Sequence, residues 1–468
     1  MKSRGRDLAA DSSIEAGSFR DHDSRVFVTP DGVHRVLSRT ALKDWEALAA
    51  SELWRELQEE GRVVATRPAP LDGLPDLLAT EAAGALRHER VPFVSYPYEW
   101  PFSMLKDAAL LQLELNLRGL RADLSLKDAS PYNVQWRGTA PVFIDVGSFE
   151  RLRPDEPWAG YRQFCMLFLY PLMLQAYKDL PFHAVLRGSL DGIPPHDARA
   201  VLSGERLRRG VLANVLLHAR LEARYGDAEG REVKREMRRA GFNQELLATN
   251  FRKLQKLVRG LEWKAGATAW TGYGEDNSYD QAAAGRKVQF VREATARRRS
   301  RLTWDVGCND GAYARIAAES ADLVVAFDAD HATVDALYRS LREEGRTDIL
   351  TLVMSVTDPS PDLGWRGLER AALELALCLA VVHHVCITGN VPVRELLDWL
   401  HSLDAALVIE FPDRSDPMVE RLLGGKRDGS NPDYERATFE RALEERFTVD
   451  RSEPVSETRT LYEARPRA

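Results

Sequence analysis

The second half of the chain alternates short apolar runs with amphipathic stretches, and this alternation constrains the fold more than any other feature. Five runs carry the pattern: LTWDV (302–306), LVVAFD (323–328), ILTLVM (349–354), LALCLAVV (375–382) and ALVIEF (406–411). Each run has the length of a strand, and the segments between them have helical spacing. Strands separated by helices form parallel sheets covered on both faces. The pattern therefore predicts an α/β domain over residues 263–468.

Ahead of this domain the sequence predicts an α+β region and a bridge of charged helices. Apolar and polar residues alternate on either side of Asp31-Gly32, a dipeptide that favours a tight hairpin turn. The stretch ALKDWEALAASELWRELQEEG has apolar residues at helical spacing, which predicts one helix that Gly61 ends. A second strand pair is expected around the turn at Arg137-Gly138. The expected divisions are a disordered N-terminus at 1–17, an α+β region at 18–194, a helical bridge at 195–262 and the α/β domain at 263–468.

Composition and charge restrict the class of protein. Hydrophobic residues make up 44% and charged residues 29%, and the mean hydropathy is −0.35, values typical of a soluble globular chain. The longest apolar run, 165–177, is interrupted by Pro171 and is too short to span a membrane. A formal net charge of −7 disfavours a dedicated nucleic-acid-binding protein. We expect neither a membrane nor a nucleic acid among its partners, and the oligomeric state stays open.

The N-terminus and the cysteines favour a cytoplasmic protein. Residues 1–23 contain no apolar stretch after their basic residues, so no secretory signal is expected. Cys165, Cys308, Cys378 and Cys386 lie in apolar or glycine-bearing segments without paired spacing. This pattern predicts reduced, buried thiols rather than disulfides or zinc ligands, and no structural metal.

Basic residues crowd the stretch just before the first strand of the α/β domain. They are Arg286, Lys287, Arg292, Arg297, Arg298, Arg299 and Arg301. One interpretation is a solvated helix face, and the other is a landing surface for an acidic substrate or carrier.

A glycine-bearing turn follows the strand LTWDV and precedes a helix. In Asp305-Val-Gly-Cys-Asn-Asp-Gly311, the two glycines permit positive φ and close approach of a ligand to the backbone. The next strand ends in Asp328, where a carboxylate can accept hydrogen bonds from both hydroxyls of a ribose. The turn lacks the full G-x-G-x-x-G spacing, which argues against a dinucleotide site.

These residues resemble the class I S-adenosylmethionine-dependent methyltransferases over roughly residues 263–468. The resemblance implies a Rossmann-like sheet with helices on both faces and a transferase that binds S-adenosyl-L-methionine. Gly307, Asn309 and Gly311 would frame the methionine part of the cofactor, Asp305 would brace the turn, and Asp328 would bind the ribose. The adenine contact, often an acidic residue after the third strand, would fall to Asp358, because Ser355 stands where it is first expected.

Two adjacent histidines, His383 and His384, follow the fourth strand of the predicted sheet. Methyltransferases of small molecules commonly carry histidines there that face the methyl group. Histidine titrates near neutral pH, so one of the two is a candidate general base for an acceptor hydroxyl. A histidine hydrogen-bonded to backbone is the alternative, and spacing does not choose between the two residues.

Two further segments have competing interpretations. Trp270, Tyr273 and Tyr279 form either an aromatic flap over the sulfonium cation or part of the core. Asn431-Pro-Asp-Tyr434 superficially resembles the Asn-Pro-Pro-Tyr motif of enzymes that methylate nucleic-acid amines, but it lies beyond the fifth strand, so we interpret it as a loop.

The N-terminal region carries a second constellation of polar residues. Asp128 and Asn133, then a predicted hairpin, then Asp145 two residues before Gly147 reproduce the order of groups used in phosphoryl transfer to orient a hydroxyl and hold magnesium. Over about residues 90–190 this resembles protein kinases and aminoglycoside phosphotransferases. No glycine-rich phosphate loop and no Lys–Glu pair can be assigned upstream. We therefore favour a kinase-like fold kept for binding or positioning, against an active phosphotransferase or a coincidence.

Two segments, SYPYEWPFSMLKDAALL (95–111) and YRQFCMLFLYPLML (161–174), are similar to bacterial proteins with a methyltransferase domain behind such a region, including rhizobial host-specific nodulation proteins. The sequence thus predicts an S-adenosylmethionine-dependent methyltransferase acting on a small-molecule or glycan-like acceptor. The alternatives are a Mg-ATP-dependent phosphotransferase activity in the N-terminal region, making a bifunctional enzyme, and a catalytically silent binding protein.

Overall fold

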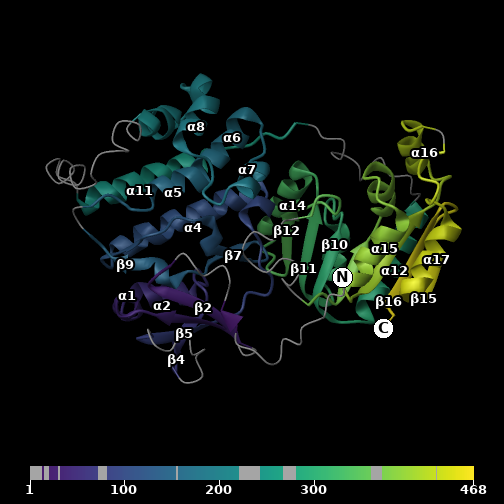
Figure 1. Ribbon diagram of the computed structural model, residues 1–468, viewed down its shortest axis with the longest axis horizontal. Helices are drawn as coiled ribbons and strands as arrows, with labels where there is room; N and C mark the ends of the chain where they lie inside the picture. Colours follow the sequence, from purple (N-terminus) through teal and green to yellow (C-terminus); the bar gives the residue numbers. More distant parts are fainter. Residues whose placement is uncertain are drawn as a thin grey trace.

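The structure, a computed structural model, places an N-terminal region beside a C-terminal α/β domain (Figure 1). It describes residues 13–14, 21–29, 32–71, 82–153, 156–220, 243–266, 281–359, 372–427 and 429–467. Most of the expected disordered N-terminus at 1–17 therefore lies outside the described residues, and Ser13–Ile14 (β1) pairs with the next strand.

The N-terminal region begins with a five-stranded antiparallel sheet in the order β1-β2-β3-β5-β4. Its strands are β2 (Ser24–Thr29), β3 (Gly32–Leu37), β4 (Thr66–Ala69) and β5 (Gly84–His88), besides β1. The pairing of β2 with β3 across residues 30–31 confirms the predicted hairpin.

The prediction of a single helix after this hairpin is wrong, because the segment forms two helices, α1 (Arg39–Ala49) and α2 (Glu52–Glu59). Ser51 accepts a hydrogen bond from the Trp54 amide at 3.2 Å and so caps a second helix. The break lets Trp45 and Trp54 pack edge to face, with ring centroids 5.1 Å apart.

The rest of the N-terminal region surrounds one long buried helix, α4 (Phe102–Leu120). Before and after α4 come η1 (Pro97–Glu99), β6 (Leu124–Leu126), η2 (Pro131–Asn133), β7 (Val134–Arg137), β8 (Ala140–Phe143), η3 (Val146–Ser148) and β9 (Phe149–Arg151). The antiparallel pairing of β7 with β8 confirms the strand pair expected around Arg137-Gly138.

Helices complete this region, and the longest of the later ones packs along α4. They are α5 (Tyr161–Phe164), η4 (Cys165–Leu169), α6 (Tyr170–Lys178), α7 (His183–Gly188), α8 (Pro195–Leu202), η5 (Ser203–Glu205), η6 (Leu212–Leu217) and α11 (Gln244–Arg259). The helical bridge at 195–262 stays a prediction as a separate division. In the part of the chain that the structure describes, no helix combines the length and the apolar character needed to cross a membrane.

The C-terminal domain is a seven-stranded, mostly parallel sheet in the order β12-β11-β10-β13-β14-β16-β15. Its strands are β10 (Ser300–Val306), β11 (Ala321–Asp328), β12 (Ile349–Val353), β13 (Leu375–Cys378), β14 (Ala406–Pro412), β15 (Phe447–Pro454) and β16 (Arg459–Pro466). The first five are mutually parallel, and β16 runs antiparallel to both β14 and β15. The predicted α/β class is confirmed.

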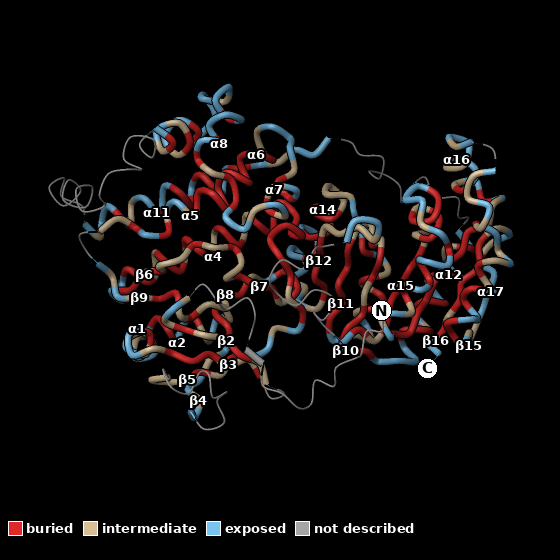
Figure 2. Tube along the Cα trace, in the orientation of Figure 1, coloured by how far each residue is buried: buried red, intermediate tan, exposed pale blue. Residues whose placement is uncertain are grey.

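Helices cover both faces of this sheet (Figure 1). They are α12 (Gln281–Ala296), α13 (Ala312–Ala317), α14 (His331–Glu343), η8 (His384–Thr388), α15 (Val393–Ser402), α16 (Pro417–Gly424) and α17 (Arg436–Arg446). Apolar residues of α12, α13 and α14 pack with one face, among them Phe290 and Leu337. Residues of α15 and α17, such as Leu396 and Phe439, pack with the other. Buried residues run through both halves of the molecule (Figure 2).

The predicted fourth strand, LALCLAVV, is shorter than expected. It ends at Cys378, and Ala380 adopts the left-handed region with φ 55°. An L-residue in this conformation cannot continue a strand, so the chain turns there toward η8.

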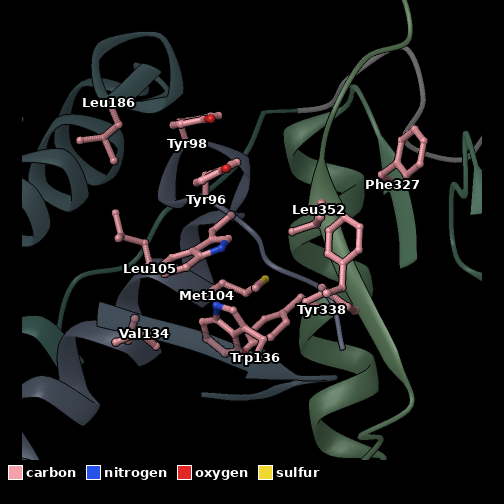
Figure 3. Close-up of a cluster of buried hydrophobic side chains, with 14 of the residues drawn as sticks. Tyr96, Tyr98, Met104, Leu105, Val134, Trp136, Leu186, Phe327, Tyr338 and Leu352 are labelled. Atoms are coloured by element: carbon pink, nitrogen blue, oxygen red, sulfur yellow. The ribbon is translucent and has the colours of Figure 1, made fainter. Parts of the chain in front are cut away.

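The two regions meet at an interface between α4 and α14 that is both apolar and polar. Figure 3 shows Trp136 and Met104 of the N-terminal region beside Tyr338 and Leu352 of the C-terminal domain. The buried Tyr338 hydroxyl lies 2.7 Å from Asp107 Oδ2. Buried polar groups stabilise a contact only when they are paired. The hydrogen bond between Tyr338 and Asp107 therefore favours one alignment of the two regions.

The basic stretch before β10 is mostly paired with acidic side chains. Arg292 bonds Glu319, Arg297 bonds Glu463, Arg299 bonds Asp322 and Arg301 bonds Glu374, while Lys287 is buried. These contacts favour the solvated helix face over a landing surface. All four cysteines are buried free thiols.

Candidate cofactor and acceptor site

The predicted site residues lie at the carboxyl ends of β10, β11 and β13. Strand order reverses between β10 and β13, because β11 and β12 follow on one side and β14 on the other. At such a reversal the loops leave the sheet in opposite directions and open a crevice in which ligands bind. The glycine turn, Asp328 and the two histidines all follow strands at this crevice.

The glycine turn begins with a backbone conformation that only glycine can adopt in these surroundings. Gly307 has φ 71°, and a Cβ there would lie 2.2 Å from Cγ2 of Val381. Gly311 has φ 75° and precedes α13, and Asn309 between them has φ 47°. The turn therefore presents bare backbone to the crevice, and the side chain of Val381 packs directly against Gly307.

Asp328 is bonded directly to this turn. Its Oδ2 accepts the amide of Asn309 at 3.2 Å, and its Oδ1 accepts the amide of Asp330 at 3.0 Å. The amides of Gly307 and Cys308 both donate to the carbonyl of Phe327. Burial raises the pKa of Asp328, while the amides act in the opposite direction. Each carboxylate oxygen keeps a further lone pair, so the side chain can still accept hydrogen bonds from a ligand.

Asp305 lies at the end of β10 and is 2% exposed. Its carboxylate accepts a hydrogen bond from the backbone of Ala314, which ties β10 to α13, and burial raises its pKa to about 7. Among the described residues, Oδ2 of Asp305 is a buried atom without a hydrogen-bond partner. Together with the exposed backbone of the glycine turn, this unpaired acceptor fits the polar amino-acid end of an S-adenosyl ligand.

The histidines begin the π-helical turn η8, and their ring centroids are 4.1 Å apart. His383 is completely buried, and neither ring nitrogen has a hydrogen-bond partner among the described residues. His384 is half-buried. Burial lowers the pKa of both imidazoles, to about 4 for His384, so both are neutral at physiological pH.

A buried ion network that the sequence analysis missed lies beside these histidines. Glu410 of β14 is fully buried, with Lys287 Nζ 2.6 Å from Oε2 and Arg459 Nη1 3.4 Å from Oε1. Arg459 also contacts Asp416, its Nε 2.6 Å from Oδ2. The one available signal was a glutamate inside the apolar run ALVIEF, because an isolated charge in a buried strand requires a partner.

The adenine candidate, Asp358, contacts the N-terminal region. Its Oδ2 accepts a hydrogen bond from Arg187 Nη1 at 2.7 Å, and its side chain is 71% exposed. Ser355 bonds Thr357, with the two hydroxyl oxygens 3.0 Å apart. Trp270, Tyr273 and Tyr279 lie outside the described residues.

The loop Asn431-Pro-Asp-Tyr434 packs against η8 and α15. Asn431 Nδ2 donates to the carbonyl of Cys386 at 2.9 Å, and Asp433 Oδ2 accepts the amide of Val393 at 2.8 Å. The hydroxyl of the buried Tyr434 donates to the carbonyl of Pro412 at 2.7 Å. The segment is a loop, as the sequence analysis interpreted it, and these bonds attach it to its neighbours.

The N-terminal constellation is assembled around an ion pair. Asp145 Oδ1 lies 2.8 Å from Arg35 Nη2 on β3, and Arg35 Nη1 donates to Ser24 at 2.9 Å. Burial, and then the nearby charge of Asp145, raise the pKa of Asp128. Asn133 ends η2, where its carbonyl accepts the amide of Ile144. No group of three or more histidine, cysteine or acidic side chains within the described ranges is placed to hold a metal ion.

Comparisons with known proteins find one similar nodulation protein and several solved structures of low sequence identity. No protein-family profile matches it. The nodulation protein NoeA of Rhizobium meliloti (strain 1021) is 32% identical over 466 residues, covering 96% of this chain and 95% of that protein. Among solved structures, the N-methyltransferase NodS from Bradyrhizobium japonicum WM9 is 14% identical and covers 40% of this chain and 98% of that chain, with a TM-score of 0.30. Magnesium protoporphyrin IX methyltransferase from Synechocystis PCC 6803 is 18% identical and covers 41% and 90%, with a TM-score of 0.30.

Proposed function

The chain belongs to the NoeA family of nodulation proteins, and from this premise we propose that it transfers a methyl group from S-adenosylmethionine to a small-molecule or glycan-like acceptor. The observation that carries the proposal is the bond between the Asn309 amide and Asp328 at the reversal of strand order. It joins the glycine turn, proposed to hold one end of the cofactor, to a carboxylate proposed to bind its ribose.

Each residue of the crevice has a task in this proposal. Gly307, Asn309 and Gly311 frame the methionine part, and Asp305 braces the turn from beneath. Asp328 accepts hydrogen bonds from the ribose hydroxyls. Asp358 stays the candidate for the adenine amine, and its ion pair with Arg187 would orient it. When bound, the cofactor supplies the electrophilic methyl group.

One of the two histidines is the proposed proton acceptor on the acceptor side. A neutral imidazole can take a proton from a hydroxyl or amine as the methyl group is transferred, and burial keeps both His383 and His384 neutral. The protein's other contribution is geometric, because holding two reactants in line and excluding water lowers the barrier by several kcal/mol.

We also propose that residues 18–194 are a kinase-like fold that binds or positions rather than transfers phosphoryl groups. The antiparallel sheet, the helices between β3 and β4, and the loops carrying Asp128, Asn133 and Asp145 support the fold. The pairing of Asp145 with Arg35 argues against a site prepared for magnesium, since a metal would compete with the guanidinium for the same oxygen.

Thermal unfolding with S-adenosylmethionine and, separately, with Mg-ATP tests these proposals. We expect S-adenosylmethionine at 100 times its Kd to stabilise the protein by about 2.7 kcal/mol, and Mg-ATP to change the midpoint little. A silent binding protein would respond to the cofactor but transfer no labelled methyl group to any small-molecule or glycan fraction. Stabilisation by Mg-ATP alone would favour the phosphotransferase instead.

A further inference from the structure

The turn after β13 is strained and therefore requires a support. Ala380 has φ 55°, a left-handed conformation that costs energy for any residue with a Cβ. Such a conformation persists only where the surrounding structure imposes it. Ala380 lies between β13 and the two histidines. The contacts that fix the backbone of Ala380 therefore also determine the positions of His383 and His384.

Glu410 supplies that support from the neighbouring strand. The register of β13 with β14 ends at Cys378 and Ile409, so Glu410 lies one residue further along, level with the start of the turn. Its carboxylate accepts a hydrogen bond from the backbone amide of Ala380. A carboxylate bonded to an amide in this way fixes both the position and the orientation of the peptide.

Two cations hold the carboxylate in turn. Lys287 lies 2.6 Å from one oxygen and Arg459 3.4 Å from the other, and all three side chains are at most 4% exposed. A buried carboxylate keeps its charge only when such partners compensate for lost hydration. Since Lys287 belongs to α12 and Arg459 to β16, Glu410 is anchored both to a helix that covers the sheet and to the neighbouring strand.

The turn has contacts toward both halves of the site. Val381, the residue after Ala380, fills the space beside Gly307 where a Cβ would clash. Its carbonyl accepts the amides of His384 and Val385 at 2.9 and 3.0 Å, which starts η8. A displacement at Ala380 would therefore move the cofactor turn and the histidines together.

From these contacts we infer that Glu410 is a positioning residue that holds the Ala380 turn, so that one buried carboxylate sets the relation of the glycine turn to His383 and His384. The inference deepens the methyltransferase proposal and rests on it for its functional consequence. Its structural content, that Glu410 holds the amide of Ala380, can be measured without a substrate.

The test is a matched pair of double variants. Removing Glu410 alone would leave Lys287 buried without its partner, so both variants carry Lys287→Met, whose thioether can pack on the Tyr313 ring that the lysine now faces. Glu410→Gln then keeps a carbonyl that can accept the Ala380 amide, whereas Glu410→Leu fills a similar volume without an acceptor. Arg459 retains Asp416 in both.

Amide hydrogen exchange at Ala380 and calorimetric titration with S-adenosylhomocysteine are the measurements. We expect E410L/K287M to exchange this amide faster and to bind S-adenosylhomocysteine about tenfold more weakly than E410Q/K287M. Adding Ala380→Gly to E410L/K287M should recover much of the lost affinity, because glycine adopts the left-handed turn without support. If Glu410 only fills space in the core, Ala380→Gly should not restore the affinity for S-adenosylhomocysteine.

Equal rates of amide exchange at Ala380 in the two double variants would overturn the inference. Equal affinities for S-adenosylhomocysteine would also overturn it, provided that both double variants bind this ligand. If no form of the protein, wild type included, binds S-adenosylhomocysteine, the proposed function fails while the exchange comparison still decides the role of Glu410. Circular dichroism and urea midpoints identify a variant that has not folded, and Glu410→Asp/Lys287→Met then replaces the one that failed.

Discussion

Arg35 Nη2 lies 2.8 Å from Asp145 Oδ1, and this ion pair ties β3 of the N-terminal sheet to the loop where a phosphotransferase would hold its metal. Both side chains are largely buried, at 11% and 16% exposure, so the pair is screened less than a surface pair would be. The guanidinium places a positive charge beside the oxygen of Asp145 that it pairs with, and this charge disfavours a magnesium ion there.

We predict that Mg-ATP binds the N-terminal region weakly and that little or no phosphate is transferred. The measurement is release of labelled phosphate from ATP, to water and to the methyl acceptor, in wild type and in Asp128→Ala and Asp145→Ala. Methyl transfer should survive Asp128→Ala in protein that still folds. A phosphorylated product that disappears with Asp128 would make the chain a two-activity enzyme.

The alternation of strands and helices, the glycine turn and Asp328 could be predicted because each depends on residues close in sequence. Local spacing predicts a strand, and a strand that ends in an acidic residue places it at the ligand edge of a parallel sheet. Positive φ at Gly307 and Gly311 is likewise a local property.

Contacts between distant residues could not be predicted in this way. Lys287 and Glu410 are 123 residues apart, and nothing near either one identifies its partner. The pairing of Tyr338 with Asp107 spans 231 residues. The split of the helix at Ser51 did carry a local signal, an N-capping residue, but continuous apolar spacing through it favoured a single helix.

Replacing Asp328 should weaken cofactor binding. Asp328→Ala removes hydrogen bonds between a carboxylate and the ribose hydroxyls, each worth at most about 1.5–3 kcal/mol, so affinity for S-adenosylhomocysteine should fall about tenfold or more. Calorimetric titration with S-adenosylhomocysteine measures this affinity. Asp322→Ala is the matched control, because Asp322 lies at the other end of β11 and forms an ion pair with the exposed Arg299. Unchanged affinity in Asp328→Ala would exclude the ribose assignment.

Replacing the histidine that we propose as general base should lower methyl transfer by about 10²–10⁴-fold while affinity for S-adenosylhomocysteine stays close to that of wild type. His383→Ala and His384→Ala, assayed with labelled S-adenosylmethionine and by calorimetry, identify which residue is the base. If both variants lose stability and activity to the same degree, the histidines are structural.

Acid should destabilise the protein through its buried histidines. Burial lowers the pKa of His384 to about 4, below the roughly 6.5 of an unfolded chain, so protonation favours the unfolded state. The stabilising contribution is complete above pH 6.5 and is lost as pH falls toward 4, by at most about 1.4 kcal/mol per pH unit. Urea unfolding between pH 7.5 and 5 measures the slope, which should be shallower in His384→Gln. An equal slope in that variant would show that His384 does not titrate differently in the two states.

The interface between the two regions should depend on one hydroxyl. Tyr338 OH lies 2.7 Å from Asp107 Oδ2 and 3.3 Å from the carbonyl of Thr139, and both partners belong to the other region. Tyr338→Phe leaves a buried carboxylate with fewer donors, so the free energy of unfolding should fall by about 1–3 kcal/mol.

Tyr132→Phe is the control for that change, because the Tyr132 hydroxyl is buried and has no hydrogen-bond partner among the described residues. Its removal should alter the free energy of unfolding by less than about 0.5 kcal/mol or increase it, since an unpaired buried hydroxyl is unfavourable. Urea midpoints followed by tryptophan fluorescence compare the two variants, and Trp136, whose ring centroid is 5.8 Å from that of Tyr338, is one of the ten tryptophans that contribute to the signal. If Tyr338→Phe unfolds at the same midpoint as wild type, the hydroxyl makes no net contribution to the free energy of unfolding, and the other apolar and polar contacts between the regions hold them together.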